Sequence, residues 1–113
     1  TAFDFLEHIP RVIIKDGKTY FPFIELLSDI YRILKPNGLF LHVTPAYPSK
    51  FAFQDPTHVN IITENTFPKY FCSIRDKGNR PKAIMYGFRG NFTLLKQGWL
   101  NEHWVICLLK VEK

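Results

Sequence analysis

The sequence predicts an α/β fold, and two observations support this class. Residues 21–35 carry apolar side chains at helical spacing, and after a tight turn residues 39–44 form an apolar run with the length of a buried strand. Two further strands are expected at residues 83–95 and 103–111. Helix, turn and buried strand make up half of a βαβ unit. We therefore expect a sheet of parallel strands that ends in an antiparallel hairpin.

The first twenty residues contain short apolar segments separated by turns. Residues 1–5 are apolar enough to end a strand, which would complete the βαβ unit with the helix that follows. Residues 6–11 are expected to form a turn. Residues 12–14 are a brief apolar run, and the polar residues 15–18 close it with a second turn.

The helix at residues 21–35 is the clearest element. Pro22 suits the first helical position, where the missing N–H of proline leaves no hydrogen bond unmade. The sequence Lys-Pro-Asn-Gly at residues 35–38 ends the helix, since proline and Asn-Gly both favour a turn. The side chains at helical spacing form one apolar stripe: Phe23, Ile24, Leu27, Ile30, Tyr31 and Leu34.

A long loop and a short helix precede the final hairpin. Residues 45–60 contain three prolines, and loops of this length in compact domains are usually functional. A short helix is expected at residues 63–71, followed by a polar loop at residues 73–82. Residues 96–102 should connect the last two strands, with Gly98 free to take a positive φ.

Length and composition limit the function classes. A chain of 113 residues forms one domain or less, and 46% hydrophobic residues exclude disorder. The net charge of +5 is spread along the chain, and its densest segment, residues 75–82, is expected to be a solvated loop. We therefore do not expect a nucleic-acid partner, a class that rests on this charge alone. No run of about 18 apolar residues occurs, so no membrane partner is expected either.

The two cysteines indicate a reducing compartment. Cys72 and Cys107 lie far apart in apolar surroundings, and their spacing suits neither a zinc knuckle nor a redox pair. Buried, reduced thiols are expected, which agrees with a cytoplasmic location.

Polar residues follow the ends of two adjacent predicted strands. Ligands of doubly wound sheets bind beyond the carboxyl ends of the strands, so residues 4–8 and 44–58 should line the same rim. Glu7 and His8 suit general-base work on a hydroxyl or amine. The alternative is that Glu7 caps a turn and His8 packs structurally.

The long loop adds a second pair of polar residues. Asp55 and His58 are three residues apart, which suits a substrate contact or an acid–base pair; a turn formed by Asp55 ahead of Pro56 is equally natural. Together with Glu7 and His8, these side chains are ligand types that suit first-row metals. Nothing in the sequence fixes the distances between them, and no metal site is expected.

Aromatic residues gather around the loop and the short helix. They form either part of the core or an apolar pocket for a substrate, in which Tyr47 and Phe53 are the expected contacts. The residues concerned are Tyr47, Phe51, Phe53, Phe67, Tyr70 and Phe71.

Three stretches together resemble one family. These are Phe-Asp-Phe-Leu-Glu-His-Ile-Pro at residues 3–10, Ile-Tyr-Arg-Ile-Leu-Lys-Pro-Asn-Gly-Leu at residues 30–39, and a strand that ends Val-Thr-Pro at residues 43–45. In this order they resemble class I S-adenosylmethionine (SAM)-dependent methyltransferases of the type 11, ubiquinone-biosynthesis-like group. Asn37 stands where that group has a glycine. The later Asp-Pro-Thr-His-Val at residues 55–59 is similar to the loop that covers the substrate pocket in bacterial members.

The resemblance covers only part of the family's fold. It implies the C-terminal half of a Rossmann-like sheet, so residues 1–113 are expected to be a single partial domain. The glycine-rich turn that would bind the cofactor does not occur, because the six glycines are scattered. The chain also begins with Thr1 rather than Met, so we expect it either to begin inside something longer or to have been processed. We therefore expect SAM to be the cofactor of a longer parent, with no useful affinity for this chain alone.

The resemblance also assigns roles to site residues. In the parent, Asp4 and Glu7 would lie at the boundary between cofactor and acceptor, and His8 or His58 would be the catalytic base. Asp55, Tyr47 and Phe53 would contact a small-molecule or sugar-like acceptor. This chain alone is expected to be inactive.

A non-enzymatic role is the alternative reading of the sequence. The chain would then be a methyltransferase-like module that pairs with itself or with a complementing chain. Residues 39–44 are expected to form the open sheet edge for that pairing.

Overall fold

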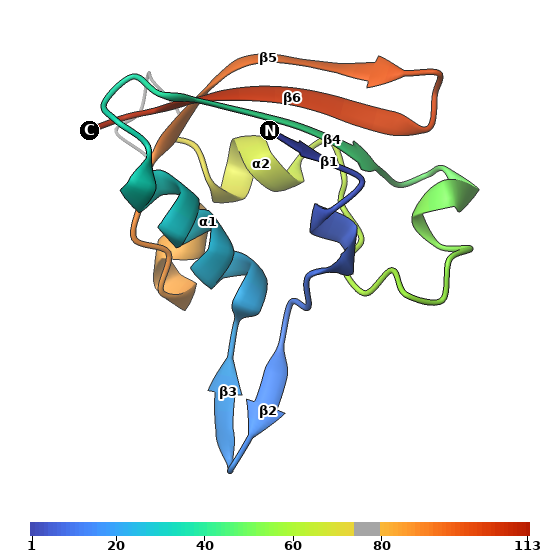
Figure 1. Cartoon of the computed structure of the whole chain (residues 1–113), viewed down its shortest axis with the longest axis horizontal. Helices are drawn as coiled ribbons and strands as arrows, with labels where there is room; N and C mark the ends of the chain where they lie inside the picture. Colours follow the sequence, from blue (N-terminus) through green and yellow to red (C-terminus); the bar gives the residue numbers. More distant parts are fainter. Residues whose placement is uncertain (74–79) are drawn as a thin grey trace.

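The computed structural model, which describes residues 1–73 and 80–113, contains one mixed sheet with helices on one side (Figure 1). Its strand order is β1 (Ala2–Phe3), β4 (Leu39–Pro45), β6 (Trp104–Val111) and β5 (Phe92–Leu100). β1 and β4 pair in parallel, whereas the β4–β6 and β6–β5 pairs are antiparallel. The α/β class and the terminal antiparallel hairpin are confirmed, while among the named strands of the described residues β1 and β4 are the parallel pair.

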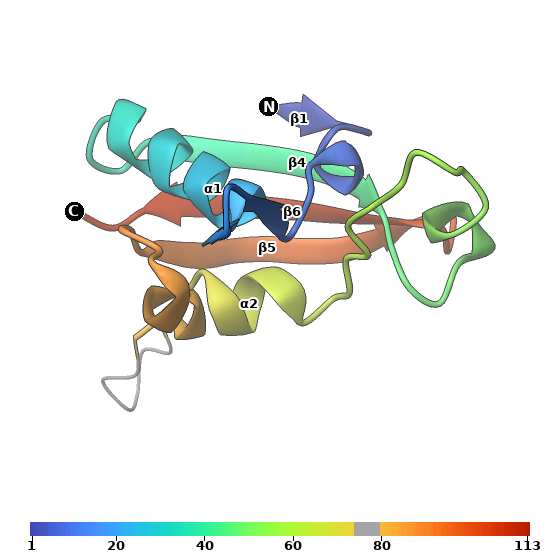
Figure 2. The same cartoon turned by 90° about the horizontal axis from the view of Figure 1, so that it is seen from below.

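The two α-helices of the described residues lie on the same face of the sheet (Figure 2). α1 (Pro22–Ile33) connects β1 to β4 and buries Phe23 and Leu27. It ends before residue 35 because Leu34 already has an extended ψ of 141°. α2 (Thr66–Tyr70) is the predicted short helix, reduced to a little more than one turn.

The covered face contains an aromatic core. The Phe23 ring lies edge-on to those of Phe67 and Phe71, with centroids 6.0 and 5.5 Å away, and Phe71 contacts Phe88 at 5.0 Å. Phe67 and Phe71 are at most 2% exposed, so these two predicted pocket aromatics belong to the core. T-shaped rings at these distances add to the stability that their burial provides.

The opposite face of the sheet carries no helix among the described residues. Along β4 and β6, buried residues alternate with half-buried ones, and the half-buried set faces away from the helices. Leu41 is paired with Leu108 and Val43 with Ile106, so this face is apolar at its centre. We call these four residues the uncovered face.

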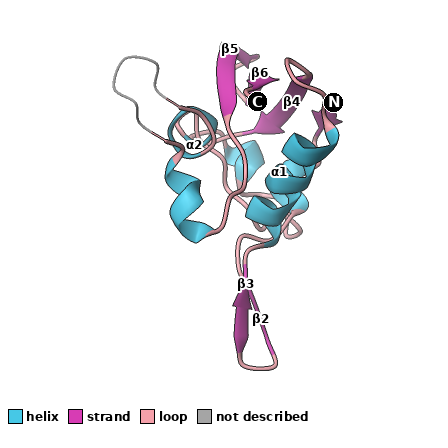
Figure 3. Ribbon diagram, turned by 90° about the vertical axis from the view of Figure 1, so that its left-hand side faces the viewer, coloured by secondary structure: helices cyan, strands magenta, loops and turns pink. Residues whose placement is uncertain are grey.

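Residues 12–20 form an element that the sequence did not predict. β2 (Ile13–Lys15) and β3 (Lys18–Tyr20) pair as a separate hairpin that projects from the rest of the molecule (Figure 3). Asp16 and Gly17 form its tip, with φ values of 52° and 74°. Two successive left-handed residues produce the tight turn that suits a two-residue hairpin loop.

The first strand of the last hairpin lies later in the chain than the sequence predicts, whereas the second, expected at residues 103–111, is confirmed as Trp104–Val111. Residues 83–95 are not one strand, because Lys82–Tyr86 is a 3₁₀ helix that ends at Gly87, whose φ is 98°. β5 therefore starts at Phe92 and includes Gly98, which was expected in the turn. The chain turns instead at Asn101 and Glu102, with φ values of 51° and 63°.

Two further expectations concern edges and charge. The edge expected to be open at residues 39–44 is covered in part, where β1 pairs with His42 and Val43 of β4. The outer strand is the two-residue β1, which leaves most of one side of β4 unpaired. Most of the basic segment 75–82 lies outside the described residues.

Both cysteines lie in the interior as free thiols. Burial raises the pKa of Cys72 and of Cys107 to about 12. Thiols with such a pKa stay protonated and unreactive at neutral pH. In the part of the chain that the structure describes, no helix is long and apolar enough to cross a membrane.

His42 makes the stability of this core dependent on pH. Its fully buried ring lies 4.0 Å from that of Phe67, and burial lowers the pKa of His42 to about 3. In the unfolded chain the imidazole of His42 takes up a proton near pH 6.5, whereas the buried ring stays neutral down to about pH 3. The contribution of the neutral ring to the stability of the native state is therefore complete above pH 6.5 and is lost as the pH falls towards 3. Between pH 6 and 4 the free energy of unfolding should fall by about 1.4 kcal/mol per pH unit from this residue.

The variant His42→Asn isolates this contribution from that of the carboxylates. Urea denaturation at several pH values should give a difference between wild type and variant that shrinks steadily from pH 6 to pH 4. Parallel pH profiles for the two proteins would contradict the assignment.

Candidate functional site

The segments that follow the two parallel strands lie side by side. After β1 the chain turns into the 3₁₀ helix Leu6–His8, and the loop after β4 returns to it. The backbone N–H groups of Val59 and Asn60 both donate to the Glu7 carbonyl oxygen, at 2.9 and 3.1 Å. The rim formed by residues 4–8 and 44–58 is therefore a feature of the structure.

Asn60 holds this junction together from inside. Its side chain is 1% exposed, and its Nδ2 donates to the Leu6 carbonyl oxygen at 3.2 Å. Its Oδ1 accepts from Arg11, whose guanidinium also donates to the Ile61 carbonyl. The sequence carries no signal for this role, because a loop asparagine has the same pattern whether it is buried or exposed.

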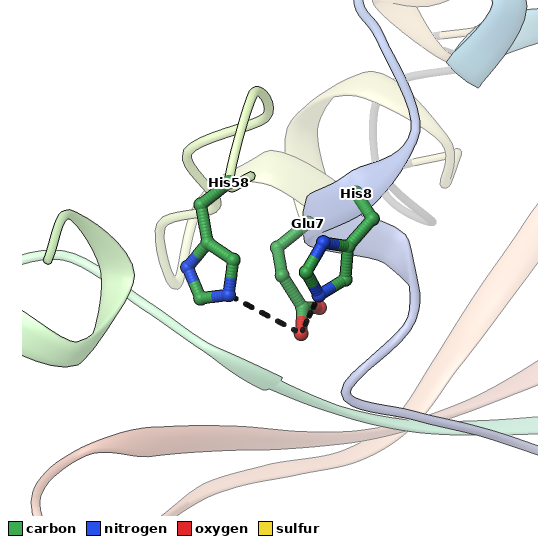
Figure 4. A group of neighbouring side chains, drawn as sticks. All are labelled: Glu7, His8 and His58. Atoms are coloured by element: carbon green, nitrogen blue, oxygen red, sulfur yellow. Dashed lines mark ion pairs between the residues drawn. The ribbon is translucent and has the colours of Figure 1, made fainter. Parts of the chain in front are cut away.

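Glu7, His8 and His58 converge at this rim (Figure 4). Glu7 Oε1 lies 3.6 Å from His8 Nε2 and 3.9 Å from His58 Nε2. The imidazole rings are edge-to-face, with centroids 4.8 Å apart. Two adjacent residues and a third about 50 positions later in the chain thus present one oxygen and two nitrogens to a common point.

Hydrogen bonds orient both imidazoles. His58 Nδ1 is 3.2 Å from the Ala52 carbonyl oxygen, and His8 Nδ1 is 3.3 Å from the Thr57 carbonyl oxygen and 3.1 Å from its hydroxyl. A carbonyl oxygen only accepts, so Nδ1 carries the hydrogen in each ring. In the neutral form of each ring, the Nε2 lone pair then faces Glu7.

The Glu7 carboxylate is buried without a hydrogen bond. The residue is 1% exposed, and neither of its side-chain oxygens has a hydrogen-bond partner among the described residues. Burial raises the pKa of Glu7, and this effect exceeds the opposing effects of its own backbone N–H, of His8 and of His58. A buried carboxylate in this state costs stability, so folding by itself gives no reason for it.

Asp55 combines the two alternatives that the sequence left open. Its Oδ1 accepts from the Thr57 N–H at 2.9 Å and from the Thr57 hydroxyl at 2.7 Å, and these bonds lower the pKa of Asp55. Its Oδ2 lies 3.7 Å from His58 Nε2. Asp55 thus closes a turn and also faces the histidine.

An open pocket of about 330 Å³ lies in front of this cluster. Trp104 opens β6 opposite Pro45, and its Nε1 donates to Asp4 Oδ1 at 3.0 Å. Only the register between β4 and β6 brings Trp104 to the rim, so the sequence alone did not predict it there. The lining residues are Asp4, Glu7, His8, Pro45, Phe51, Gln54, Asp55, His58 and Trp104.

Two predicted substrate contacts lie apart from this pocket. The ring centroids of Tyr47 and Phe53 lie 6.3 Å apart, and both side chains are more than half exposed. Neither residue lines the pocket. Phe51 contributes the aromatic wall instead, stacked at 4.1 Å on His103.

Asp4 and Glu7, which the resemblance places at the boundary between cofactor and acceptor, both line this pocket. Asp4 bonds to Trp104, and Glu7 is directed at the two histidines. Among the described glycines, only Gly17 and Gly87 have positive φ, and neither lines the pocket.

Comparison with known proteins yielded no match to a family model, to a curated protein or to a solved structure.

Replacing the buried carboxylate should stabilise the protein. In Glu7→Gln, the amide can donate to an Nε2 lone pair, so the variant should gain about 1 kcal/mol in the free energy of unfolding. Chemical denaturation at pH 7 measures the change. Glu25→Gln, which removes the same charge at an exposed position, should change the value by less than about 0.5 kcal/mol. A loss of stability in Glu7→Gln would show that the carboxylate is structural.

Proposed function

We propose that this chain is the acceptor-side half of a SAM-dependent methyltransferase with a small-molecule or sugar-like acceptor. The observation that carries the proposal is the convergence of Glu7, His8 and His58 at the carboxyl ends of β1 and β4, in an open pocket. These residues belong to the Leu-Glu-His and Asp-Pro-Thr-His stretches through which the sequence resembles that family.

The sheet supports the same proposal. Its parallel pair connected by α1 and its closing antiparallel hairpin are what the C-terminal half of a Rossmann-like sheet would contain. Doubly wound sheets carry helices on both faces, whereas here the described helices lie on one. The uncovered face would suit the packing of further elements of a larger domain.

The chemistry of this half would be positioning and proton removal. An acceptor hydroxyl or amine in the pocket would lose its proton to an imidazole Nε2, and the Glu7 carboxylate would stabilise the imidazolium that forms. The His8 side chain is 37% exposed and directly accessible, while that of His58 is 8% exposed and lies deeper. Asp55 would hold a polar group of the acceptor.

This mechanism predicts a loss of turnover in the natural protein that contains these residues. His8→Asn or His58→Asn should lower kcat/KM for methyl transfer from labelled SAM by about 10²-fold or more, because a positioned base contributes that much. Glu25→Gln, on the exposed side of α1, should leave kcat/KM unchanged. Activity that is unaffected by both histidine substitutions would refute the role of the cluster in catalysis.

The chain by itself should not bind SAM. Calorimetric titration of residues 1–113 should give no saturable heat, because no glycine-rich turn approaches the pocket. Micromolar affinity would overturn the assignment of the cofactor to a separate half. A cytoplasmic location is part of the same proposal, supported by the two free, buried cysteines.

A second candidate function is a pairing module, and the uncovered face favours it. Leu41, Val43, Ile106 and Leu108 form an apolar surface, and beyond the short β1 the edge of β4 is unpaired. Apolar faces and open edges both promote association.

Light scattering tests this second function. A module that pairs with itself should have about twice the 13.3 kDa mass of the chain. Ile106→Lys should shift the mass towards the monomer by placing a charge on the uncovered face, whereas the exposed Ile33→Lys on α1 should not. A strictly monomeric wild type would count against pairing with itself.

A further inference from the structure

We propose that Glu7, His8 and His58 form a binding site for a divalent first-row transition metal ion. The site goes beyond methyl transfer and does not depend on it, since the proposal concerns what this chain binds. It also departs from the sequence, whose spacing did not lead us to expect a metal. The decisive observation is a carboxylate 1% exposed, without a hydrogen-bond partner, directed at two imidazole nitrogens.

The donor set selects the class of ion. Two imidazole nitrogens and one carboxylate oxygen suit zinc, iron, cobalt or nickel, whereas magnesium and calcium prefer oxygen donors throughout. Three protein ligands leave at least one coordination position for water or for an oxygen donor of a ligand. Asp55 is not counted as a ligand, because only His58 Nε2 among the cluster atoms has an ion-pair contact with it, at 3.7 Å.

The spacing of the donor atoms is close to that of a metal site. The ligand atoms of Glu7, His8 and His58 all lie within 4.8 Å of one another, with the carboxylate at 3.6 and 3.9 Å from the two nitrogens. Bonds of about 2.0–2.2 Å in a tetrahedral site hold donor atoms about 3.4 Å apart. Small side-chain rotations would bring these three atoms to that separation.

The surroundings prepare both histidines to act as ligands. Metal-bound histidines usually donate the other ring N–H to a carbonyl or carboxylate, which fixes the tautomer and the orientation of the ring. Here the carbonyls of Ala52 and Thr57 accept from the Nδ1 atoms of His58 and His8. Both Nε2 lone pairs are therefore directed inward, and a cation between them would remove their repulsion with the carboxylate.

Two of the proposed ligands are enclosed by the protein, and the third is accessible from the pocket. Glu7 and His58 are enclosed and held by the loop, while the half-exposed His8 faces the open pocket. An ion would enter past His8, and its free coordination position would face the space where an acceptor is proposed to bind. With an ion bound, the acceptor oxygen would contact the metal instead of an imidazole nitrogen.

Calorimetry on the metal-free 113-residue chain tests the site, with Zn²⁺ as the probe. One ion should bind per chain with a Kd of about 10 µM or tighter, and the Tm should rise by several degrees in excess Zn²⁺. Glu7→Gln and His8→Asn should each weaken Zn²⁺ binding by at least about 10-fold. Co²⁺ bound at the same site should show visible absorption bands of a tetrahedral nitrogen and oxygen environment.

Two matched controls make the result specific. His103→Asn removes a histidine outside the cluster, and Glu25→Gln removes an exposed carboxylate; both should keep the wild-type Kd. The proposal is overturned if wild type binds no Zn²⁺ below about 100 µM, or if the cluster variants bind as tightly as the controls. Methyl transfer is not part of this experiment, so its outcome is separate from the failure or success of the proposed enzyme function.

Discussion

Two backbone hydrogen bonds determine the arrangement of the candidate site. The N–H groups of Val59 and Asn60 donate to the carbonyl of Glu7 and thereby join the loop after β4 to the 3₁₀ helix after β1. Asn60 reinforces the junction from the buried side through its bond to the Leu6 carbonyl. Without this junction, His58 would have no fixed distance to Glu7, and the pocket would lose one wall. The geometry of a chemical site here depends on main-chain pairing between two irregular segments.

The same junction buries the Glu7 carboxylate, which contributes no hydrogen bond to the fold. Glu7 is enclosed without a hydrogen bond, which lowers the stability of the native state, while the aromatic core around Phe67 and Phe71 offsets that cost. Proteins commonly tolerate such local costs where activity requires them. Both proposals use this carboxylate, as the partner of an imidazolium or as the ligand of a metal ion.

The layering of the molecule connects the two candidate functions. Helices cover one face of the sheet, while Leu41, Val43, Ile106 and Leu108 lie on the other. A larger enzyme domain and a pairing module would both bury that face, the first with further elements of the domain and the second with another chain. The pocket faces the end of the sheet rather than either face, so burial of the uncovered face would leave access to the histidines open.

The sequence by itself determined the features that depend on neighbouring residues. The stripe beginning at Phe23 specified α1, and the apolar run at residues 103–111 specified the strand observed as Trp104–Val111. The sequence also placed Glu7 and His8 after the end of β1, and His58 in the loop after β4. Only the tertiary structure decided that Lys82–Tyr86 is helical, that Tyr47 and Phe53 lie outside the pocket, and that Trp104 lies within it. These outcomes depend on strand register and on contacts between residues up to about a hundred positions apart, and local spacing carries no information about such contacts.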